Sequence, residues 1–163
     1  MWVYAILGFV IIQRLAELVY AKANTQRLLK MGGQEHEAAH YYLIVAVHVT
    51  WIAALLWYAP NQPINMVFLA LYGLLQIFRI WVFASLGRRW TTRIIIVPNE
   101  TLVARGPYKY FRHPNYMVVI GEITCLPLIF GLWKIALIFS ILNLIALYIR
   151  INAEEAVLKP LRK

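Results

Sequence analysis

Long apolar runs, separated by charged or Pro/Gly-containing breaks, dominate the chain from its first residues to its last third. A helix needs about 20 apolar residues to cross the hydrocarbon core of a bilayer, whereas a membrane barrel shows alternating ten-residue segments, which this sequence lacks. We therefore expect an all-α fold, a polytopic transmembrane helical bundle that forms a single domain over residues 1–163. The predicted spans are residues 2–20, 41–59, 64–86, 115–131 and 133–150.

The composition supports a membrane protein, because 62% of the residues are hydrophobic and only 14% are charged. Soluble domains carry about 25% charged residues. The first apolar run has no basic segment before it and no small-residue cleavage site after it. We expect this run to stay in the mature protein as a span and not to be removed as a signal peptide.

The basic residues are concentrated in three places: the connection 21–40, the connection 87–114 and the tail after residue 150. If five spans alternate in direction, all three lie on one side of the bilayer. The excess of Lys and Arg in cytoplasmic loops then predicts an outside N-terminus and a cytoplasmic C-terminus. The net charge of +9 is explained in this way, so the expected partner is the lipid bilayer and not nucleic acid.

Ionisable side chains inside predicted spans are costly and indicate functional sites. Each one here falls within about seven to nine residues of the cytoplasmic end of its span, or about 10–14 Å at a rise of 1.5 Å per residue. This one-sided distribution favours a pocket open to the cytoplasm over a transporter site at the midplane. The residues are Arg14, Glu17, His48, Arg79, Glu122 and Arg150.

Three of these residues, Arg79, Glu122 and His48, are candidates for lining a substrate pocket. Structural roles remain open as well. Arg14 and Glu17 are three residues apart on one helical face and suit an ion pair, Arg79 suits snorkelling to the interface, and His48 suits a hydrogen-bonded packing position. No His, Cys, Asp and Glu spacing resembles a metal site, so no metal is expected.

The connection between spans three and four, residues 86–116, is long for a compact protein and rich in aromatic residues, so we expect it to be ordered and functional. Thr91–Val97 is predicted to be extended. Turns are expected at Pro98–Glu100 and at Arg105–Tyr108, and His113-Pro114 should open the fourth span.

The last span ends in RINAEEAVL, residues 150–158. Arg150 and Glu154 share a helical face, and Glu155 is offset by about 100°. A solvated helix end explains these charges in isolation. Their position across one hairpin from RHPNY, residues 112–116, favours a site.

The ordered set of GPYKYFRHPNY (106–116), a helical hairpin and RINAEEAVL, preceded by LGRRWT (86–91), resembles the isoprenylcysteine carboxyl methyltransferase (ICMT) family of integral membrane enzymes. The first two spans look similar to its small bacterial branch, which includes alkylpyrone O-methyltransferases. The apolar runs place three N-terminal spans in residues 1–86, and the resemblance implies a cofactor-binding loop, hairpin and tail in residues 87–163. It also implies a bacterial inner membrane with the site facing the cytoplasm.

The resemblance further implies S-adenosylmethionine (SAM) as the methyl donor, held between the long connection and the last two helices. Matching positions give the cofactor contacts as His113, Tyr116, Glu154 and Glu155, with the surrounding loop shaped by Arg105, Gly106 and Tyr108. Arg150 is assigned to catalysis, where it would hold an anionic oxygen of the acceptor near the methyl group.

Methyl transfer from a sulfonium to oxygen is a direct displacement, so the protein mainly aligns the reactants and excludes water. The expected acceptor is an amphiphile that is already ionised: a prenylcysteine-type carboxylate, or an acidic hydroxyl of an alkylpyrone or alkylresorcinol. Since the chain lacks the additional N-terminal spans of eukaryotic members, a free amphiphile is favoured.

Two other classes of protein remain open from the sequence. The first is a membrane reductase of the sterol-reductase type, which would use NADPH. The second is a non-enzymatic membrane subunit, in which RHPNY and the charged end of the last span are interfacial side chains. Binding of SAM to the purified protein discriminates these classes from a methyltransferase.

Overall fold

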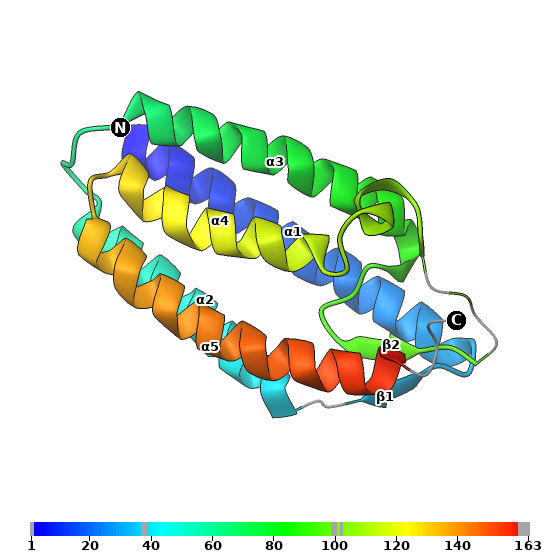
Figure 1. Ribbon diagram of the computed structural model, residues 1–163. Coiled ribbons are helices and arrows are strands. Elements are labelled where there is room, and N and C mark those ends of the chain that lie inside the picture. Colours follow the sequence, from blue (N-terminus) through cyan, green and yellow to red (C-terminus); the bar gives the residue numbers. More distant parts are fainter. Residues whose placement is uncertain (1, 37–38, 99–100, 102, 160–163) are drawn as a thin grey trace.

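Helices that run side by side along one common axis form most of the computed structural model, which describes residues 2–36, 39–98, 101 and 103–159 (Figure 1). Within those residues there are five α-helices. They are α1 (Trp2–Lys30), α2 (Ala39–Tyr58), α3 (Met66–Leu86), α4 (Pro114–Ile129) and α5 (Trp133–Leu158). The predicted all-α bundle is confirmed.

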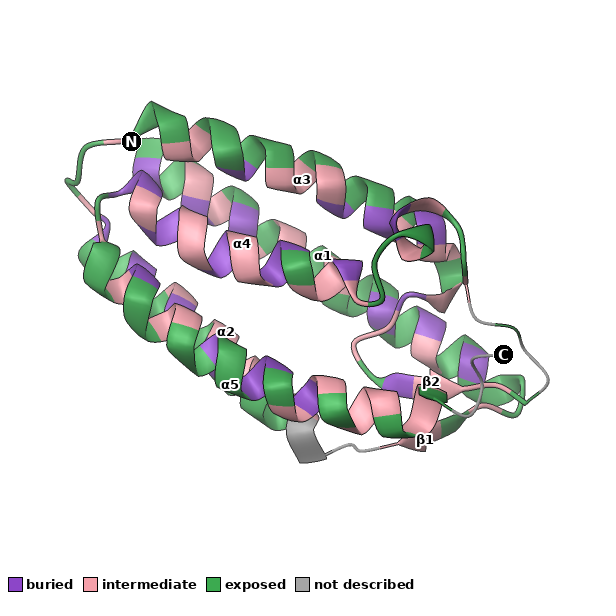
Figure 2. Cartoon of the chain, in the orientation of Figure 1, coloured by how far each residue is buried: buried purple, intermediate pink, exposed green. Residues whose placement is uncertain are grey.

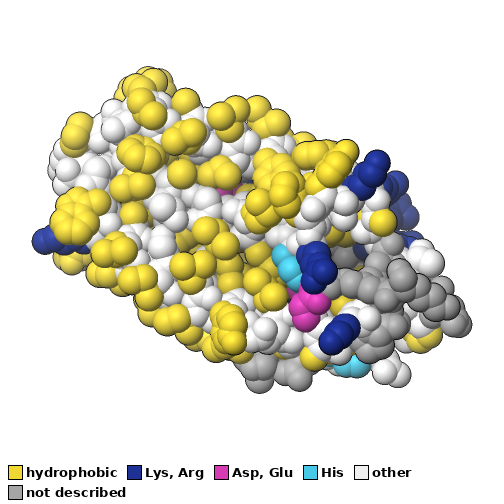
Figure 3. All heavy atoms as spheres, in the orientation of Figure 1, with side chains coloured by type: hydrophobic (Ala, Val, Ile, Leu, Met, Phe, Trp, Pro, Cys, Tyr) yellow, Lys and Arg dark blue, Asp and Glu magenta, His cyan; other side chains and the backbone are white. Residues whose placement is uncertain are grey.

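Four of these helices, α1, α2, α3 and α5, are long and apolar enough to cross a membrane. The exception is α4, which has 16 residues where the sequence predicted a span over 115–131. Hydrophobic side chains cover the outside of the bundle (Figure 3), among them Ile12, Val19, Ile77 and Ile80, all more than 65% exposed. Such a surface requires lipid around it, and the chain is an integral membrane protein.

The C-terminal ends of α1, α3 and α5 lie at one end of the bundle, which we call the connection end (Figure 1). Buried residues occur along the whole bundle (Figure 2), and the main apolar cluster lies in the half opposite the connection end. There, Leu7 of α1 packs with Trp51 and Leu55 of α2 and with Ile123 and Leu126 of α4, all fully buried. The connection end is therefore the part of the molecule in which polar side chains can gather.

The first helix is longer than the sequence predicted, because residues 21–30 continue α1 instead of belonging to the connection. Ala21, Asn24 and Leu28 are buried and share one face of the helix. The side chain of Asn24 donates a hydrogen bond of 2.8 Å to the carbonyl oxygen of Trp90. Packing against the long connection thus stabilises the additional turns.

The predicted tight hairpin between the last two helices is confirmed. Gly131 adopts φ +68°, and the amide of Leu132 donates to the carbonyl oxygen of Pro127 at 3.0 Å. Because the turn is so short, α4 and α5 run antiparallel, and the start of α4 lies at the same end as the last turns of α5 (Figure 1).

Short elements organise the connection end. The strands β1 (Gln34–His36) and β2 (Ile94–Ile96) pair antiparallel, which confirms the extended segment expected within 91–97. The 3₁₀ helices are η1 (Gly87–Arg89) and η2 (Gly106–Lys109); the latter occupies the turn expected at 105–108. The turn predicted at Pro98–Glu100 includes residues 99–100, which lie outside the described residues.

Candidate functional site

The RHPNY segment and the charged end of α5 meet at the connection end. His113 is the N-cap residue of α4, and Pro114 occupies the first helical turn, where its missing amide hydrogen costs nothing. The antiparallel hairpin then places this turn beside the end of α5. We call the resulting group the end cluster: His113, Tyr116, Arg150, Glu154 and Glu155.

Hydrogen bonds connect the end cluster across the two helices. Nε2 of His113 lies 2.6 Å from a carboxylate oxygen of Glu155. The Tyr116 hydroxyl donates to Glu154 and accepts from Nε of Arg150 at 3.1 Å. The rings of His113 and Tyr116 stack with their centroids 5.4 Å apart. The predicted meeting of these two segments is confirmed, and a tyrosine links the arginine to the carboxylate.

The members of the end cluster differ in exposure. Arg150 is only 6% exposed, and its Nη2 donates a 2.8 Å hydrogen bond to the carbonyl oxygen of Thr92 in the connection. The side chains of Glu154 and Glu155 are 23% and 27% exposed. On the face shown in Figure 3, acidic side chains and a histidine reach the surface together at this end. The arginine is fixed, whereas the carboxylates are accessible to a ligand.

The loop residues dock the connection onto α3. Nε of Arg105 donates to the carbonyl oxygen of Ser85 at 2.9 Å. Gly106 has φ +60°, and a Cβ atom there would lie 2.0 Å from the Ser85 hydroxyl, so only glycine fits. Burial, with a smaller contribution from the negative charge of Glu154, raises the pKa of Tyr108. Tyr108 thus lies near Glu154 of the end cluster, whereas Arg105 and Gly106 hold the segment that carries it.

Two of the three predicted pocket residues, Arg79 and Glu122, belong instead to a separate group, the ion cluster, together with Arg14 and Glu17. Glu122 of α4 accepts at 2.6 Å from both Arg14 of α1 and Arg79 of α3. Arg79 also pairs with Glu17, and Arg14 lies 3.2 Å from Glu17. Two arginines and two glutamates balance in charge.

Arg79 does not snorkel to the interface, so that expectation is wrong: the residue is 3% exposed, because Glu17 and Glu122 provide buried partners. Two glutamines complete the ion cluster. Gln13 donates to Gln76 at 2.8 Å, and Gln76 donates to Glu122 at 2.7 Å. The sequence analysis missed both glutamines, although their position within apolar runs, next to Arg14 and three residues before Arg79, was an available signal.

His48, the third predicted pocket residue, has the contacts of a packing residue. Its Nδ1 lies 2.8 Å from the carbonyl oxygen of Ile44 one turn earlier, and its ring meets Trp51 edge-on at 6.3 Å. Among the residues that the structure describes, no group of His, Cys, Asp and Glu side chains is arranged to hold a metal ion.

One polar atom near the end cluster was missed by the sequence analysis. Oδ1 of Asn115, between His113 and Tyr116, is buried and has no hydrogen-bond partner within the described part of the chain. A buried acceptor without a donor is costly unless a ligand or water satisfies it. Asparagine in a first helical turn is common, so the sequence alone gave little signal.

Comparisons with known proteins agree with this architecture. The sequence model of the isoprenylcysteine carboxyl methyltransferase (ICMT) family matches residues 66–160, which include α3, the long connection and the final hairpin. The uncharacterized protein YpbQ of Bacillus subtilis is 36% identical over 161 residues, which cover 96% of both chains. An uncharacterized protein of Haemophilus influenzae is 28% identical over 144 residues, 85% of this chain and 84% of its own. No solved structure matches.

Proposed function

Because this chain belongs to the isoprenylcysteine carboxyl methyltransferase family of membrane methyltransferases, we propose that it transfers a methyl group from SAM to an oxygen atom of a lipid-like acceptor. The observation that carries the proposal is the end cluster. It joins two accessible carboxylates, two stacked rings and a buried arginine at the end of a membrane bundle. These groups suit a cationic soluble donor beside an anionic membrane acceptor.

The donor set fits SAM in charge and hydrogen-bonding capacity. Glu154 and Glu155 supply negative charge and acceptor atoms for an ammonium group or ribose hydroxyls. The stacked rings of His113 and Tyr116 offer aromatic faces, which attract a sulfonium cation. The buried Oδ1 of Asn115 adds an acceptor for a donor group of the ligand. The carboxylates, the aromatic faces and the amide oxygen all favour a cationic ligand over an anionic one.

When bound, SAM supplies an activated methyl group, and a carbon–oxygen bond forms as the carbon–sulfur bond breaks and its electron pair remains on sulfur. The residues of this chain have to orient the reactants and keep water out. The hydrogen bonds from Arg150 to Tyr116 and from Tyr116 to Glu154 fix these three groups relative to one another. We assign His113, Tyr116, Glu154 and Glu155 to the donor side.

Arg150 is assigned to the acceptor. Its Nε and Nη2 are engaged with Tyr116 and Thr92, and its Nη1 has no hydrogen-bond partner within the described residues. A guanidinium fixed by two bonds can direct the third nitrogen at an anionic oxygen without reorganisation. An acceptor ionised near neutral pH needs no proton removal, which favours a carboxylate or an acidic enol or phenol.

The surroundings favour an acceptor that reaches the site from the bilayer. The end cluster lies at one end of a bundle whose outer surface is apolar, so an acceptor with a hydrocarbon tail would keep the tail in the bilayer and its polar head at the end cluster. The basic residues of the connection end favour the cytoplasmic face, and the similar proteins of two bacteria favour a bacterial inner membrane.

Equilibrium binding of SAM to the detergent-purified protein tests the donor. We expect saturable binding that falls by at least about tenfold in His113→Ala and in Glu154→Ala, because each loses hydrogen bonds to a charged group. Glu35→Gln is the matched control: this carboxylate lies at the same end but pairs with Arg93, so SAM affinity should not change.

Two results would contradict the proposal. In the first, the monodisperse wild-type protein binds reduced nicotinamide and ignores SAM, which supports a reductase. In the second, it binds neither compound, and the substitutions change only its stability. That outcome indicates a non-enzymatic membrane subunit.

A further inference from the structure

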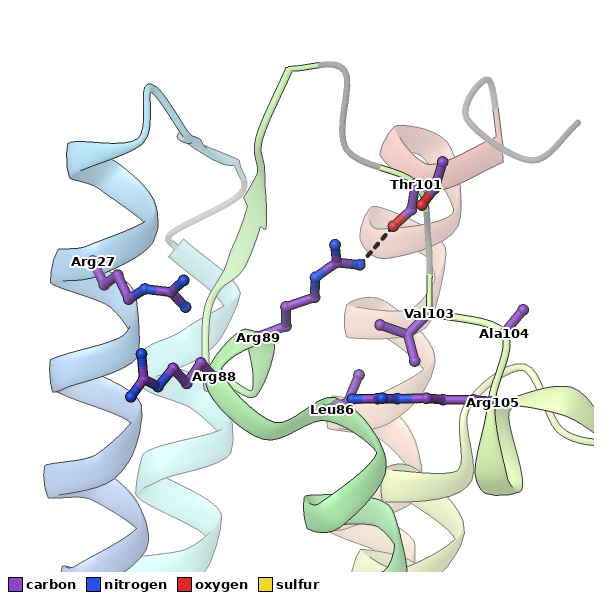
Figure 4. Close-up of a pocket in the computed structure, with 8 residues that line it drawn as sticks. All are labelled: Arg27, Leu86, Arg88, Arg89, Thr101, Val103, Ala104 and Arg105. Atoms are coloured by element: carbon purple, nitrogen blue, oxygen red, sulfur yellow. Dashed lines mark hydrogen bonds between the residues drawn. The ribbon is translucent and has the colours of Figure 1, made fainter.

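A cavity of about 530 Å³ opens at the connection end, apart from the end cluster (Figure 4). None of the five residues of the end cluster lines it. Half of the lining residues are arginines, so we call it the arginine cavity. It is lined by Arg27, Leu86, Arg88, Arg89, Thr101, Val103, Ala104 and Arg105.

The four arginines come from three separate parts of the chain. Arg27 projects from the last turns of α1, Arg88 and Arg89 from η1, and Arg105 from the segment before η2 (Figure 4). Arg89 and Arg105 are oriented by bonds to the carbonyl oxygens of Thr101, at 2.6 Å, and Ser85, at 2.9 Å. Two of the four arginines are therefore held in position by hydrogen bonds to the backbone.

No acidic residue is among the described residues that line the arginine cavity. Arg27 and Arg88 are exposed and have no ion pair within the part of the chain that the structure describes. Cations gathered around one hollow repel each other unless an anion joins them. The hydrogen bond from Arg105 to Ser85 does not change this, since a carbonyl oxygen carries no net charge.

The general excess of basic residues at this end does not explain the arrangement. Lys22, Lys30, Lys109 and Arg112 lie at the same end and do not line the cavity. The excess of Lys and Arg in cytoplasmic loops explains why basic residues lie on this side of the membrane. It does not explain why four of them surround one cavity. All four converging residues are arginines, whose planar guanidinium groups bind phosphate oxygens two at a time.

We propose that the arginine cavity is a binding site for a phosphate group, separate from the methyl donor site. Charge disfavours SAM there, because SAM carries a net positive charge and would face arginines. The volume suits a head group or a small phosphate compound. The position at the end of α1 and α3 is where basic pockets between membrane helices bind lipid phosphates.

A phosphate bound in the arginine cavity would link α1 to the long connection. A phosphate held by Arg27, Arg88 and Arg105 bridges the first helix, the start of the connection at η1 and the segment that docks η2. Since a ligand that binds only the folded protein stabilises it, phosphate binding should raise the unfolding temperature.

The test measures two probes on the full chain, with sodium chloride at equal ionic strength as the reference. Inorganic phosphate and pyrophosphate are titrated in neutral detergent while thermal unfolding is followed. Retained phosphatidylglycerol, against phosphatidylcholine, is measured by native mass spectrometry after reconstitution. The variant is the double substitution Arg27→Gln with Arg88→Gln, and its matched control is Lys22→Gln with Lys30→Gln, which removes the same charge nearby.

We expect at least one probe to bind wild type and the lysine control alike, and to lose about tenfold or more in affinity in the arginine variant. Phosphatidylglycerol retention that soluble phosphate does not displace identifies a lipid head group. Stabilisation by soluble phosphate identifies a free ligand. Arg27→Lys with Arg88→Lys should bind with intermediate affinity, because charge is kept and the planar fork is lost.

The proposal is overturned if neither probe binds wild type beyond the chloride reference. It is equally overturned if the lysine control loses as much affinity as the arginine variant, since binding would then be a diffuse surface effect. If the arginine variant unfolds, the Arg27→Lys with Arg88→Lys protein still tests the proposal, because it keeps the charges and should show the intermediate affinity; wild-type affinity in that protein would overturn the proposal.

Discussion

The ion cluster and the end cluster are built from the same residue types and differ in what satisfies them. In the ion cluster, two arginines face two glutamates, two glutamines add hydrogen bonds, and Glu122 is fully buried. In the end cluster, one arginine faces two partly exposed glutamates. The first group is neutral, and its charged side chains are all paired within the protein. The second is partly exposed, so its carboxylates can be reached by a cationic ligand.

The position of each cluster fits this difference. The ion cluster joins α1, α3 and α4 through long side chains in the interior of a membrane bundle, where an unpaired charge is very costly. The end cluster joins α4, α5 and the connection at the bundle end. Charged residues within spans thus indicate two kinds of feature, and the balance of charge and exposure tells them apart.

Breaking the balance of the ion cluster should have the largest effect on stability. Glu122→Gln leaves Arg14 and the buried Arg79 with one carboxylate, so we expect the free energy of unfolding to fall by about 3–5 kcal/mol. Chemical unfolding in detergent measures it. Replacing both partners, as Arg79→Met with Glu122→Leu, should cost less than the single change; an equal or greater loss would mean that the pairing is not what holds this region.

Loss of the guanidinium in the end cluster should slow turnover strongly with little loss of donor affinity. For Arg150→Lys we expect a fall in kcat of about 10²-fold, because a lysine cannot bond Tyr116, Thr92 and an acceptor oxygen at once. Single-turnover methyl transfer and SAM binding are measured on the same sample. An equal loss in both would place Arg150 in the donor site.

A backbone change at the support of the end cluster should have an intermediate effect. Gly106→Ala places a Cβ atom against the Ser85 hydroxyl at a positive φ, which costs about 1–3 kcal/mol. We expect the docking of η2 to loosen and SAM affinity to fall severalfold, since Tyr108 belongs to this helix. Hydrogen exchange of residues 103–110 should rise; unchanged exchange would show that the close contact with Ser85 is not required.

The smallest effect is expected at the surface ion pair between Glu35 and Arg93, whose atoms lie 2.8 Å apart. The side chain of Arg93 is 42% exposed, so Glu35→Gln should change the free energy of unfolding by less than about 1 kcal/mol. Thermal unfolding at two salt concentrations measures this. A loss as large as that of Glu122→Gln would remove the distinction between buried and exposed pairs.

The sequence was sufficient to predict the bundle, the short hairpin and the meeting of RHPNY with Arg150 and Glu154, because each follows from runs of apolar residues and one tight turn. It was not sufficient for the ion cluster, since Arg14 and Glu122 are 108 positions apart and their pairing depends on how three helices pack. The extension of α1 was missed for a similar reason. It depends on Asn24 meeting Trp90, 66 positions later.

The arginine cavity illustrates the same limit. Its arginines were visible as a basic bias, but Arg27 and Arg105 line one cavity only because the connection packs against α1 at η1. Local sequence patterns predict helices and turns. Which side chains from distant segments come together can be seen only in the three-dimensional structure.

The most direct test of the account compares SAM binding to Glu154→Gln and Glu122→Gln, counted per folded molecule by equilibrium dialysis. The account predicts that Glu154→Gln loses about tenfold or more in affinity at nearly unchanged stability, because an accessible acceptor for the cation is removed. Glu122→Gln should lose stability and keep the affinity of its folded fraction. Undiminished SAM binding in Glu154→Gln, together with lost binding in folded Glu122→Gln, would place the donor in the ion cluster and contradict the account.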